Sequence, residues 1–286
     1  MRTHILYILL CFATLLQAQE QKELVILHTN DIHSTIEPLS TTLTDTMLQG
    51  RAGMARYAAM VEQERLQHPD LLLLDSGDFS QGSPYYVFFQ GEVEIALMNL
   101  MGYDAATLGN HEFDYGMDTL ANRLAKAHFP IVCSNADFKD TPLKDIVKPY
   151  IVLKRGGVKI GIFGLLPNPK GLIFASNYKG MKYLDPVECT QKTVDILRRK
   201  EGCQIVICLS HLGWNMEPEL GDQQLISQCE GIDLVLGGHS HTYMQQMEWV
   251  NDRKGKAVGI DQNGKHGAFV GRIVMELEKN RKPYSK

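Results

Sequence analysis

The chain has 286 residues, in which 29 Lys and Arg stand against 33 Asp and Glu, so that its formal net charge is −4. Hydrophobic residues make up 44% of the sequence and charged residues 22%, proportions that are ordinary for a globular enzyme with a deep core. The weak negative charge gives no broad basic surface, which argues against a nucleic-acid polymer as a partner.

The N-terminus has the pattern of a signal peptide. Arg2 is followed by an apolar stretch from Ile5 to Leu16 and by Ala18 before a polar segment, and these are the features of such a peptide. The stretch is too short for a helix that spans a bilayer, which needs about 20 apolar residues. We therefore expect a signal peptide at 1–18 and export to the periplasm or the exterior; a buried N-terminal strand or helix is the alternative.

The remaining residues, 19–286, contain no repeat, low-complexity tract or long linker and are expected to form one domain. Apolar runs of strand length alternate with amphipathic helical patterns, which predicts an α/β fold with largely buried parallel strands. The expected strands are Leu24–Leu27, Leu71–Leu74, Ala105–Leu108, Ile131–Ser134, Ile205–Leu209 and Leu234–Leu236. The expected helices carry apolar faces at Met54, Tyr57, Ala58 and Val61, at Leu120, Ala121, Leu124 and Ala125, and at Val187, Thr190, Val194 and Leu197.

Two segments depart from this alternation. Tyr150–Leu153 and Val158–Phe163 flank Gly156-Gly157 and are expected to form a β-hairpin. The C-terminal runs around Val258 and at Phe269–Met275 also have strand character, with no helix between them. Parallel strands early in the chain and antiparallel strands later indicate more than one sheet.

The cysteines beyond the signal peptide are expected to be core thiols. Their spacings are not those of zinc sites, and two of them lie within apolar runs, where cysteine is usually a small buried hydrophobe. One disulfide is left open. The cysteines are Cys133, Cys189, Cys203, Cys208 and Cys229.

Polar residues that can bind a metal follow five of the expected strands. Because ligands in α/β proteins bind outside the carboxyl ends of the strands, we expect these residues to converge. The candidate ligands are carboxylates, imidazoles and an amide, with no thiolate among them. In chain order they are Asp31, His33, Asp78, Asn110, His211, His239 and His241.

Two pairs of these candidates are spaced two residues apart. They are Asp31 with His33 and His239 with His241. In extended backbone the side chains of such a pair point the same way, so each pair is expected to place two ligands on one metal.

The number of candidates indicates two metal ions. One ion of four to six coordination cannot use them all, whereas two ions that share a carboxylate can. Asp78 stands alone at its strand end and is the expected bridge. Asn110 and His111 are adjacent and point apart if extended, so that one can bind metal while the other faces the substrate. This ligand chemistry suits Zn, Mn, Fe or Co, and Mg is a further candidate.

Other histidines lack such a context. His68, His128 and His266 are expected on the surface. His28 is left open, because it lies on the segment that carries Asp31.

The motifs that hold these residues resemble the ordered motifs of the calcineurin-like metallophosphoesterases. The finer resemblance, carried by Thr29-Asn30-Asp31-Ile32-His33 and by Gly53-Met54-Ala55-Arg56, is to the 5′-nucleotidase/UDP-sugar hydrolase branch, and it extends from about Leu24 to Leu277. It implies a four-layer α-β-β-α sandwich of two mixed β-sheets flanked by helices. The family motifs correspond here to Asp31-Ile32-His33, Gly77-Asp78-Phe79, Gly109-Asn110-His111-Glu112-Phe113-Asp114, Ser210-His211 and Gly238-His239-Ser240-His241.

The resemblance also implies two divalent metal ions and a separate catalytic pair. A hydroxide held by the metals would attack phosphorus. His111 would stabilise the transition state or protonate the leaving oxygen, and Asp114 would orient His111. The first metal would be held by Asp31, His33 and His241 and the second by Asn110, His211 and His239, with Asp78 between them. Some members of the branch carry Gln or Asn where this chain has His241.

The implied activity is hydrolysis of a small phosphate ester, and the first expectation is a 5′-nucleotidase that acts on nucleoside monophosphates. The alternatives are a cyclic-nucleotide phosphodiesterase, a UDP-sugar hydrolase or a sulfur-ester hydrolase with the same centre, and a non-catalytic binding module. Nucleotidases of this branch usually continue into a second domain that stacks the base between aromatic rings, whereas this sequence ends at Lys286. A separate chain that supplies this domain is therefore an expected partner.

Overall fold

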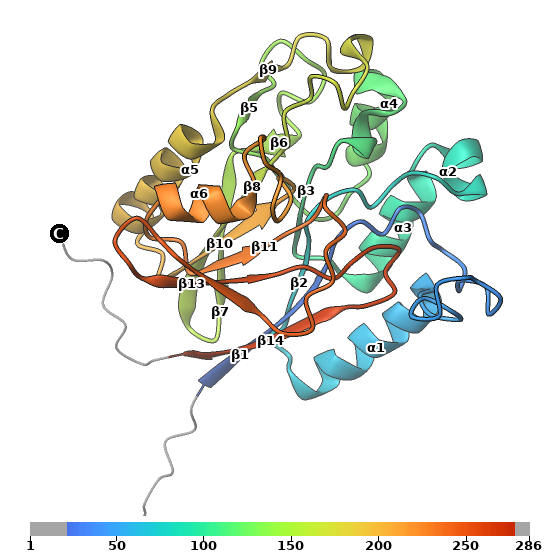
Figure 1. The fold of residues 1–286 in the computed structure, drawn as a ribbon, viewed down its shortest axis with the longest axis horizontal. Helices are drawn as coiled ribbons and strands as arrows, with labels where there is room; N and C mark the ends of the chain where they lie inside the picture. The colour runs from blue at the N-terminus through green and yellow to red at the C-terminus, as the bar shows by residue number, and fades with distance from the viewer. Residues whose placement is uncertain (1–21, 278–286) are drawn as a thin grey trace, which may run out of the picture.

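The computed structural model describes residues 22–277 and shows two six-stranded β-sheets packed face to face, with helices on their outer sides (Figure 1). The four-layer α-β-β-α sandwich expected from the sequence is confirmed. The predicted signal peptide at 1–18 lies outside the described residues. Within residues 22–277, no helix has both the length and the apolar character that a membrane span requires.

The first sheet has the order β14-β1-β2-β3-β4-β6. β1 pairs in parallel with β2 and antiparallel with β14, which returns from the C-terminal part of the chain to form one edge. In this sheet β1, β2, β3, β4 and β6 run parallel to one another, so that their carboxyl ends lie at one side of the sheet. The bounds are β1 (Lys22–Thr29), β2 (Leu72–Asp75), β3 (Ala105–Thr107), β4 (Ile131–Val132), β6 (Val147–Lys148) and β14 (Gly271–Leu277).

The second sheet has the order β12-β13-β11-β10-β8-β7. Its four inner strands are parallel, and the edge strands β7 and β12 are antiparallel to their neighbours. β7 and β8 form the hairpin predicted around Gly156-Gly157. The bounds are β7 (Tyr150–Arg155), β8 (Val158–Leu165), β10 (Ile205–Ser210), β11 (Leu234–Leu236), β12 (Glu248–Asn251) and β13 (Ala257–Asp261). A two-stranded sheet pairs β5 (Ala136–Asp137) with β9 (Lys182–Tyr183).

The core has three apolar layers, because successive side chains on a strand point to opposite faces of its sheet. On β1, Leu24 faces the layer between the two sheets and Val25 faces the layer under the helices of the first sheet. On β10, Ile207 belongs to the layer between the sheets and Val206 to the layer under the helices of the second. The continuous apolar runs in the sequence therefore correspond to strands that are covered on both faces.

Helices follow most of the parallel strands. α1 buries Met54, Tyr57 and Val61, the face that the sequence predicts. α5 begins where Asp185 accepts a hydrogen bond from the Glu188 N–H, which satisfies one of the free donors at a helix start. The bounds are α1 (Met54–Gln67), α2 (Pro84–Phe89), α3 (Glu92–Met101), α4 (Gly116–Leu124), α5 (Pro186–Asp195) and α6 (Asp222–Gln228), with short 3-10 turns at His111–Phe113 and Ala175–Tyr178 and a π turn at Ile196–Lys200.

The cysteines of the described chain are free thiols, and all but Cys189 are buried, as the sequence predicts for most of them. Cys208 lies on β10, where its side chain packs in the layer between the second sheet and its helices. The disulfide that the sequence left open does not form among residues 22–277.

Candidate metal centre

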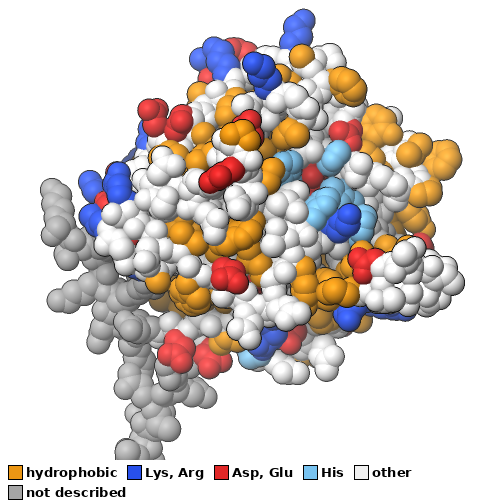
Figure 2. All heavy atoms as spheres, viewed as in Figure 1, with side chains coloured by type: hydrophobic (Ala, Val, Ile, Leu, Met, Phe, Trp, Pro, Cys, Tyr) orange, Lys and Arg blue, Asp and Glu red, His pale blue; other side chains and the backbone are white. Residues whose placement is uncertain are grey.

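All seven candidate ligands lie at one side of the sandwich, where the carboxyl ends of strands from both sheets meet. β1, β2 and β3 of the first sheet and β10 and β11 of the second each lead into one of the predicted loops. Histidine side chains gather at one place on the face shown in Figure 2, with an acidic side chain among them. The convergence predicted from the sequence is therefore observed.

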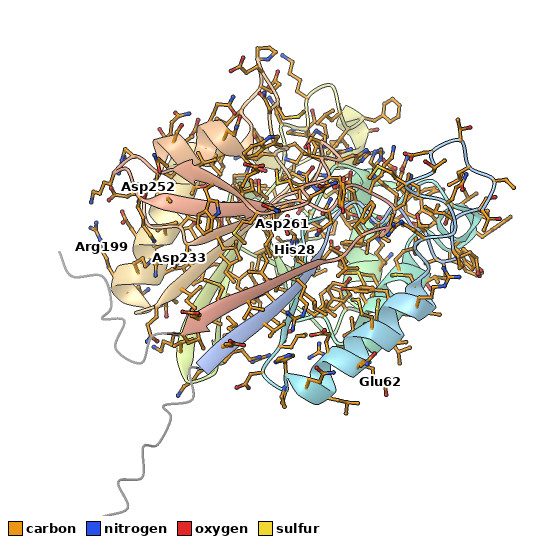
Figure 3. The ribbon with its side chains drawn as sticks, turned by 60° about the horizontal axis from the view of Figure 1, so that its bottom comes forward. His28, Glu62, Arg199, Asp233, Asp252 and Asp261 are labelled. Atoms are coloured by element: carbon orange, nitrogen blue, oxygen red, sulfur yellow. The ribbon has the colours of Figure 1, made fainter. Side chains whose placement is uncertain are left out.

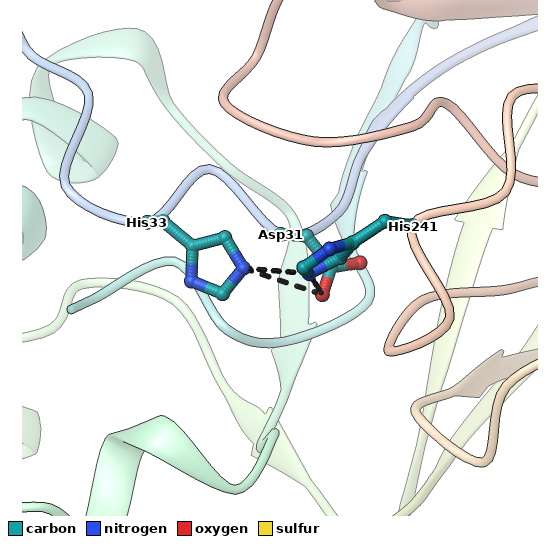
Figure 4. Close-up of side chains that lie close together, drawn as sticks. All are labelled: Asp31, His33 and His241. Atoms are coloured by element: carbon teal, nitrogen blue, oxygen red, sulfur yellow. Dashed lines mark hydrogen bonds and ion pairs between the residues drawn. The ribbon is translucent and has the colours of Figure 1, made fainter. Parts of the chain in front are cut away.

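The first ligand group consists of Asp31, His33 and His241. The Nε2 atoms of the two histidines lie 2.9 Å apart, and they lie 3.7 Å (His33) and 3.3 Å (His241) from Oδ1 of Asp31 (Figure 4). Asp31 and His33 are buried, whereas the side chain of His241 is 35% exposed. Three ligand atoms thus point at one small space that opens toward solvent.

The second ligand group consists of Asp78, His211 and His239. His211 Nε2 lies 3.0 Å from Asp78 Oδ2 and 3.8 Å from Asp31 Oδ1, so the two groups are neighbours. The amide oxygen of Asn110 is buried and has no hydrogen-bond partner among the described residues. A buried oxygen without a partner costs free energy unless a ligand satisfies it, so Asn110 fits the metal that the family implies.

The backbone at these residues differs from the extended conformation assumed for the sequence pairs. Asp31, His33, His239 and His241 all have positive φ, at 49°, 48°, 71° and 53°. His239 and His241 fall into different ligand groups, so the expectation from their spacing that this pair shares one metal is wrong. Asp31 and His33 also have positive φ but lie in one group, so a spacing of two residues does not by itself fix the directions of the side chains.

Glycines allow the loops to approach one another. A Cβ atom on Gly109 would lie 2.1 Å from Asp78 Oδ1, and one on Gly238 would lie 2.8 Å from His211 Nδ1. Both distances are far inside van der Waals contact, so only a residue without a side chain fits at either position. The glycines beside the ligands therefore set the spacing between ligand loops from different strands.

The histidine environments favour neutral imidazole at two of the ligands. Burial outweighs the neighbouring carboxylates and lowers the pKa of both His33 and His239 to about 4. Burial also acts on His211, but there the carboxylates of Asp78 and Asp31 dominate and raise its pKa to about 10. His211 Nδ1 lies 2.6 Å from the Ser76 carbonyl oxygen and donates to it, which directs Nε2 into the ligand group. Metal binding at His211 therefore displaces a proton.

His111 and Asp114 form a separate pair beside the ligands. His111 Nδ1 lies 3.0 Å from Asp114 Oδ2, within the 3-10 turn that follows Asn110. The His111 ring is 5.6 Å from that of His33, measured between centroids. Burial lowers the pKa of His111, but the hydrogen bond to Asp114 and the charges of Asp78 and Asp114 outweigh it and raise that pKa above its usual value.

Asn30 holds the Asp31 carboxylate, a contact that the sequence did not indicate. Its Nδ2 donates to Asp31 Oδ2 over 2.7 Å and to the Gly264 carbonyl, and the His239 N–H donates to the same carboxylate oxygen. With Oδ2 occupied in this way, Oδ1 faces the histidines of both groups. The position of Asn30 directly before Asp31 is the only signal that the sequence carries.

Glu112 joins the second and third ligand loops from within. Its buried carboxylate accepts hydrogen bonds from the N–H groups of Asp78, Gly109 and Ser80, over 2.9, 2.6 and 3.2 Å. Arg123 donates to the Glu112 carbonyl oxygen from α4. The sequence places Glu112 within the motif from Gly109 to Asp114, but it does not indicate this contact with the loop after β2.

Two histidines outside the ligand set also lie near the centre. His28, at the end of β1, is fully buried, and its Nε2 lies 3.0 Å from Asp261 Oδ2 at the end of β13, so the pair joins the two sheets (Figure 3). His266 was expected on the surface, and it is partly exposed. Its backbone N–H nevertheless donates to the Asp31 carbonyl and its ring lies 5.8 Å from that of His33, because the segment before β14 folds back over the first ligand loop.

The fold and the two adjacent candidate ligand groups are those of a metallophosphoesterase, a family that uses a dinuclear metal centre. The sequence model of the calcineurin-like phosphoesterases matches residues 24–243, and the chain belongs to this family.

Among characterised proteins, the 5′-nucleotidase of Bos taurus is 33% identical over 97% of this chain and 50% of its own length. The trifunctional nucleotide phosphoesterase protein YfkN of Bacillus subtilis is 31% identical over 90% of this chain and 18% of its own. The crystal structure of a 5′-nucleotidase precursor from Thermus thermophilus has a TM-score of 0.82 at 31% identity, over 92% of this chain and 53% of that one. The chain thus spans half or less of the length of these two curated relatives.

Proposed function

We propose that this chain hydrolyses nucleoside monophosphates, as a 5′-nucleotidase. Asp31, His33 and His241 would hold one divalent ion, and Asn110, His211 and His239 the other, with Asp78 between them. When bound, two such ions offset the charge of the phosphate and lower the pKa of water. The proposal rests on one observation above all, that two ligand groups meet beside the His111–Asp114 pair.

The chain's own residues supply a proton at the leaving group. Asp114 accepts from His111 Nδ1, which keeps a proton on that nitrogen and leaves Nε2 free to act on the substrate. The raised pKa of His111 favours the imidazolium form, which can donate to a leaving alkoxide or stabilise transition-state charge. His111 is half-buried, so a substrate can reach it.

The resemblance to 5′-nucleotidases supports the nucleotide as substrate, and a panel of esters tests it. AMP, UDP-glucose, 2′,3′-cyclic AMP and bis-p-nitrophenyl phosphate are offered to the purified chain, with Mn²⁺ and Zn²⁺ added separately. We expect AMP to give the highest kcat/KM. A higher value with one of the other esters would replace the nucleotidase by the corresponding hydrolase or phosphodiesterase. If none of these four phosphate esters reacts and a sulfur ester offered under the same conditions does, the centre is a sulfur-ester hydrolase. No turnover with any ester and either metal would favour the binding module.

Two further predictions belong to the whole protein. That a separate chain supplies base recognition stays a prediction. If it is right, this chain alone should hydrolyse AMP and UMP with similar kcat/KM. Export by a cleaved peptide at 1–18 also stays a prediction, and the N-terminal sequence of the mature protein checks it. A strong preference of the isolated chain for one base would contradict the first, and an intact Met1 in the mature protein would contradict the second.

A further inference from the structure

A cavity of about 520 Å³ lies directly beside the second ligand group. It is lined by the loop 167–172 after β8, by the start of α5 with the residues before it, by the segment 212–220 after β10 and by Gln228 of α6. His239 forms part of its wall. A larger cavity of about 870 Å³ beside α1 and α3 contains none of the site residues, so the smaller one is the candidate for substrate binding.

Eight of the fifteen residues that line this cavity are apolar. The polar residues of the lining are Asn168, Lys170, Asp185, Glu219, Gln228 and His239. Its size and this mixture are those of cavities that bind small organic molecules. The apolar and aromatic residues of the wall are Pro167, Leu172, Tyr183, Pro186, Val187, Leu212, Met216 and Leu220.

The cavity adjoins the second ligand group through His239. His239 belongs both to its wall and to the second ligand group. The segment that begins with the 167–172 loop continues beyond the cavity to Asn177, whose Nδ2 donates to the Asp114 carbonyl over 2.9 Å. A phosphate at the second ligand group would thus lie next to this cavity, with His239 between them.

Gly213 keeps the space beside His239 open. A Cβ atom there would lie 2.7 Å from both Cγ and Sδ of Met216 and 3.5 Å from His239 Cδ2. Met216 lines the cavity, so a side chain at position 213 would push it away from its present place. The absence of this side chain lets Met216 pack close to the ligand histidine, which makes the wall next to the centre apolar.

We propose that this cavity binds the organic leaving group of the phosphate ester, and that it favours a flat, uncharged group such as a nucleoside. The inference rests on the proposed function and adds a substrate subsite within this chain. The apolar part of the wall gives affinity for an organic group of suitable size without distinguishing one base from another. The subsite therefore agrees with weak discrimination among bases by the isolated chain.

The charges around the cavity indicate which esters it disfavours. Lys170 is the one lysine or arginine among the described residues that line it, whereas Asp185 and Glu219 are both acidic. A second phosphate in the leaving group would meet this excess of negative charge. Esters with a neutral leaving group are accordingly preferred over those that release a nucleotide, such as UDP-glucose.

A matched pair of substitutions on one loop tests the subsite. Leu172 lines the cavity and is 48% exposed, whereas Phe174, two residues further on, is 82% exposed and does not line it. In Leu172→Trp the larger ring fills part of the cavity, and we expect KM for AMP to rise about tenfold, as loss of substrate contacts predicts. KM for glycerol 2-phosphate, whose leaving group is small, should change less than about twofold. Phe174→Trp should leave both values as they are.

A binding measurement without turnover separates this inference from the proposed function. Adenosine is titrated calorimetrically into the metal-free chain and into both variants, and we expect Leu172→Trp alone to weaken its binding. Val187→Trp, at the start of α5, is the second filling variant if Leu172→Trp does not fold. If AMP is hydrolysed but neither filling variant changes KM or adenosine binding, the subsite is wrong. If no ester is hydrolysed but adenosine binds as described, the proposed function is wrong while the cavity remains a nucleoside site.

Discussion

Asn110 and His111 are neighbours in the chain, yet their side chains are placed for different chemistry. The Asn110 amide oxygen is buried and lacks a hydrogen-bond partner in the described part of the chain, whereas the His111 side chain is 30% exposed and bonded to Asp114. The short 3-10 turn that starts after Asn110 causes this difference, because it brings Asp114 within reach of His111. One residue is thus suited to hold a metal and the next to move a proton.

Replacement of His111 by Asn tests this division of tasks. We expect the variant to retain both metals and to lose about 10²–10⁴-fold in kcat, the usual contribution of a general acid. Metal content by atomic absorption and kcat with AMP are the measurements. Asp114→Asn, which keeps the imidazole but removes the negative charge that holds its proton, should lose less. Near-normal turnover in His111→Asn would exclude the assignment.

At the scale of elements, each ligand loop is a tight turn at the end of a strand, and the loops interlock through glycines and buried carboxylates. The Glu112 carboxylate accepts hydrogen bonds from N–H groups of the loops after β2 and β3. Gly109 has no side chain, so the Asp78 carboxylate can lie against its backbone. The ligands are therefore positioned by contacts between loops rather than by any one loop. These contacts between loops explain how several non-glycine residues can keep left-handed backbone, since such strained backbone is stable only where the surrounding structure holds it in place.

The substitution Gly109→Ala tests this interlocking. Its added methyl group would overlap the Asp78 carboxylate, so we expect Asp78 to shift, metal affinity to fall by about 10–100-fold as for other supports of ligands, and turnover to fall with it. Gly82→Ala is the matched control, because Gly82 has a positive φ of 86° but open space around it. That variant should lose only about 1 kcal/mol of folding free energy from backbone strain. Equal metal affinity in the two variants would refute the argument.

At the scale of the whole molecule, each of the two ligand groups contains residues from both sheets. Asp31 and His33 follow a strand of the first sheet, and His241 follows a strand of the second. Bound metal would therefore tie the sheets together at this side, in addition to the apolar layer between them and the buried His28–Asp261 pair. Because the ligand groups exist only in the folded chain, metal binding adds to the stability of the fold.

Removal of metal tests this link. A metal at about 100 times its Kd stabilises the folded state by about 2.7 kcal/mol, so treatment with EDTA should lower Tm by about 5–10 °C for a domain of this size. Re-addition of Mn²⁺ or Zn²⁺ should restore it, as followed by scanning calorimetry. Asp31→Asn, which weakens the first ligand group, should show a smaller shift. A Tm that is the same with and without EDTA would contradict the prediction.

The sequence by itself determined the fold class and which candidate ligand residues lie at one edge of the sheets. The apolar runs are long enough to be strands covered on both faces, and the polar residues follow them directly, so position along the chain already indicates the edge of the sheet at which Asp31, Asp78 and His211 gather. Because side chains on a strand alternate between the two faces of its sheet, the sequence of a strand also indicates which core layer each side chain joins. These features depend on local pattern, which a single sequence records.

Only the tertiary structure decided how these residues are supported. Asp31, His33, His239 and His241 all adopt left-handed backbone, and partners of Glu112 and His28 come from loops or strands distant in sequence. The cavity beside His239 is likewise built from several segments that meet only in the folded chain. Such contacts depend on backbone direction and on close approach between distant segments, neither of which the order of residues expresses.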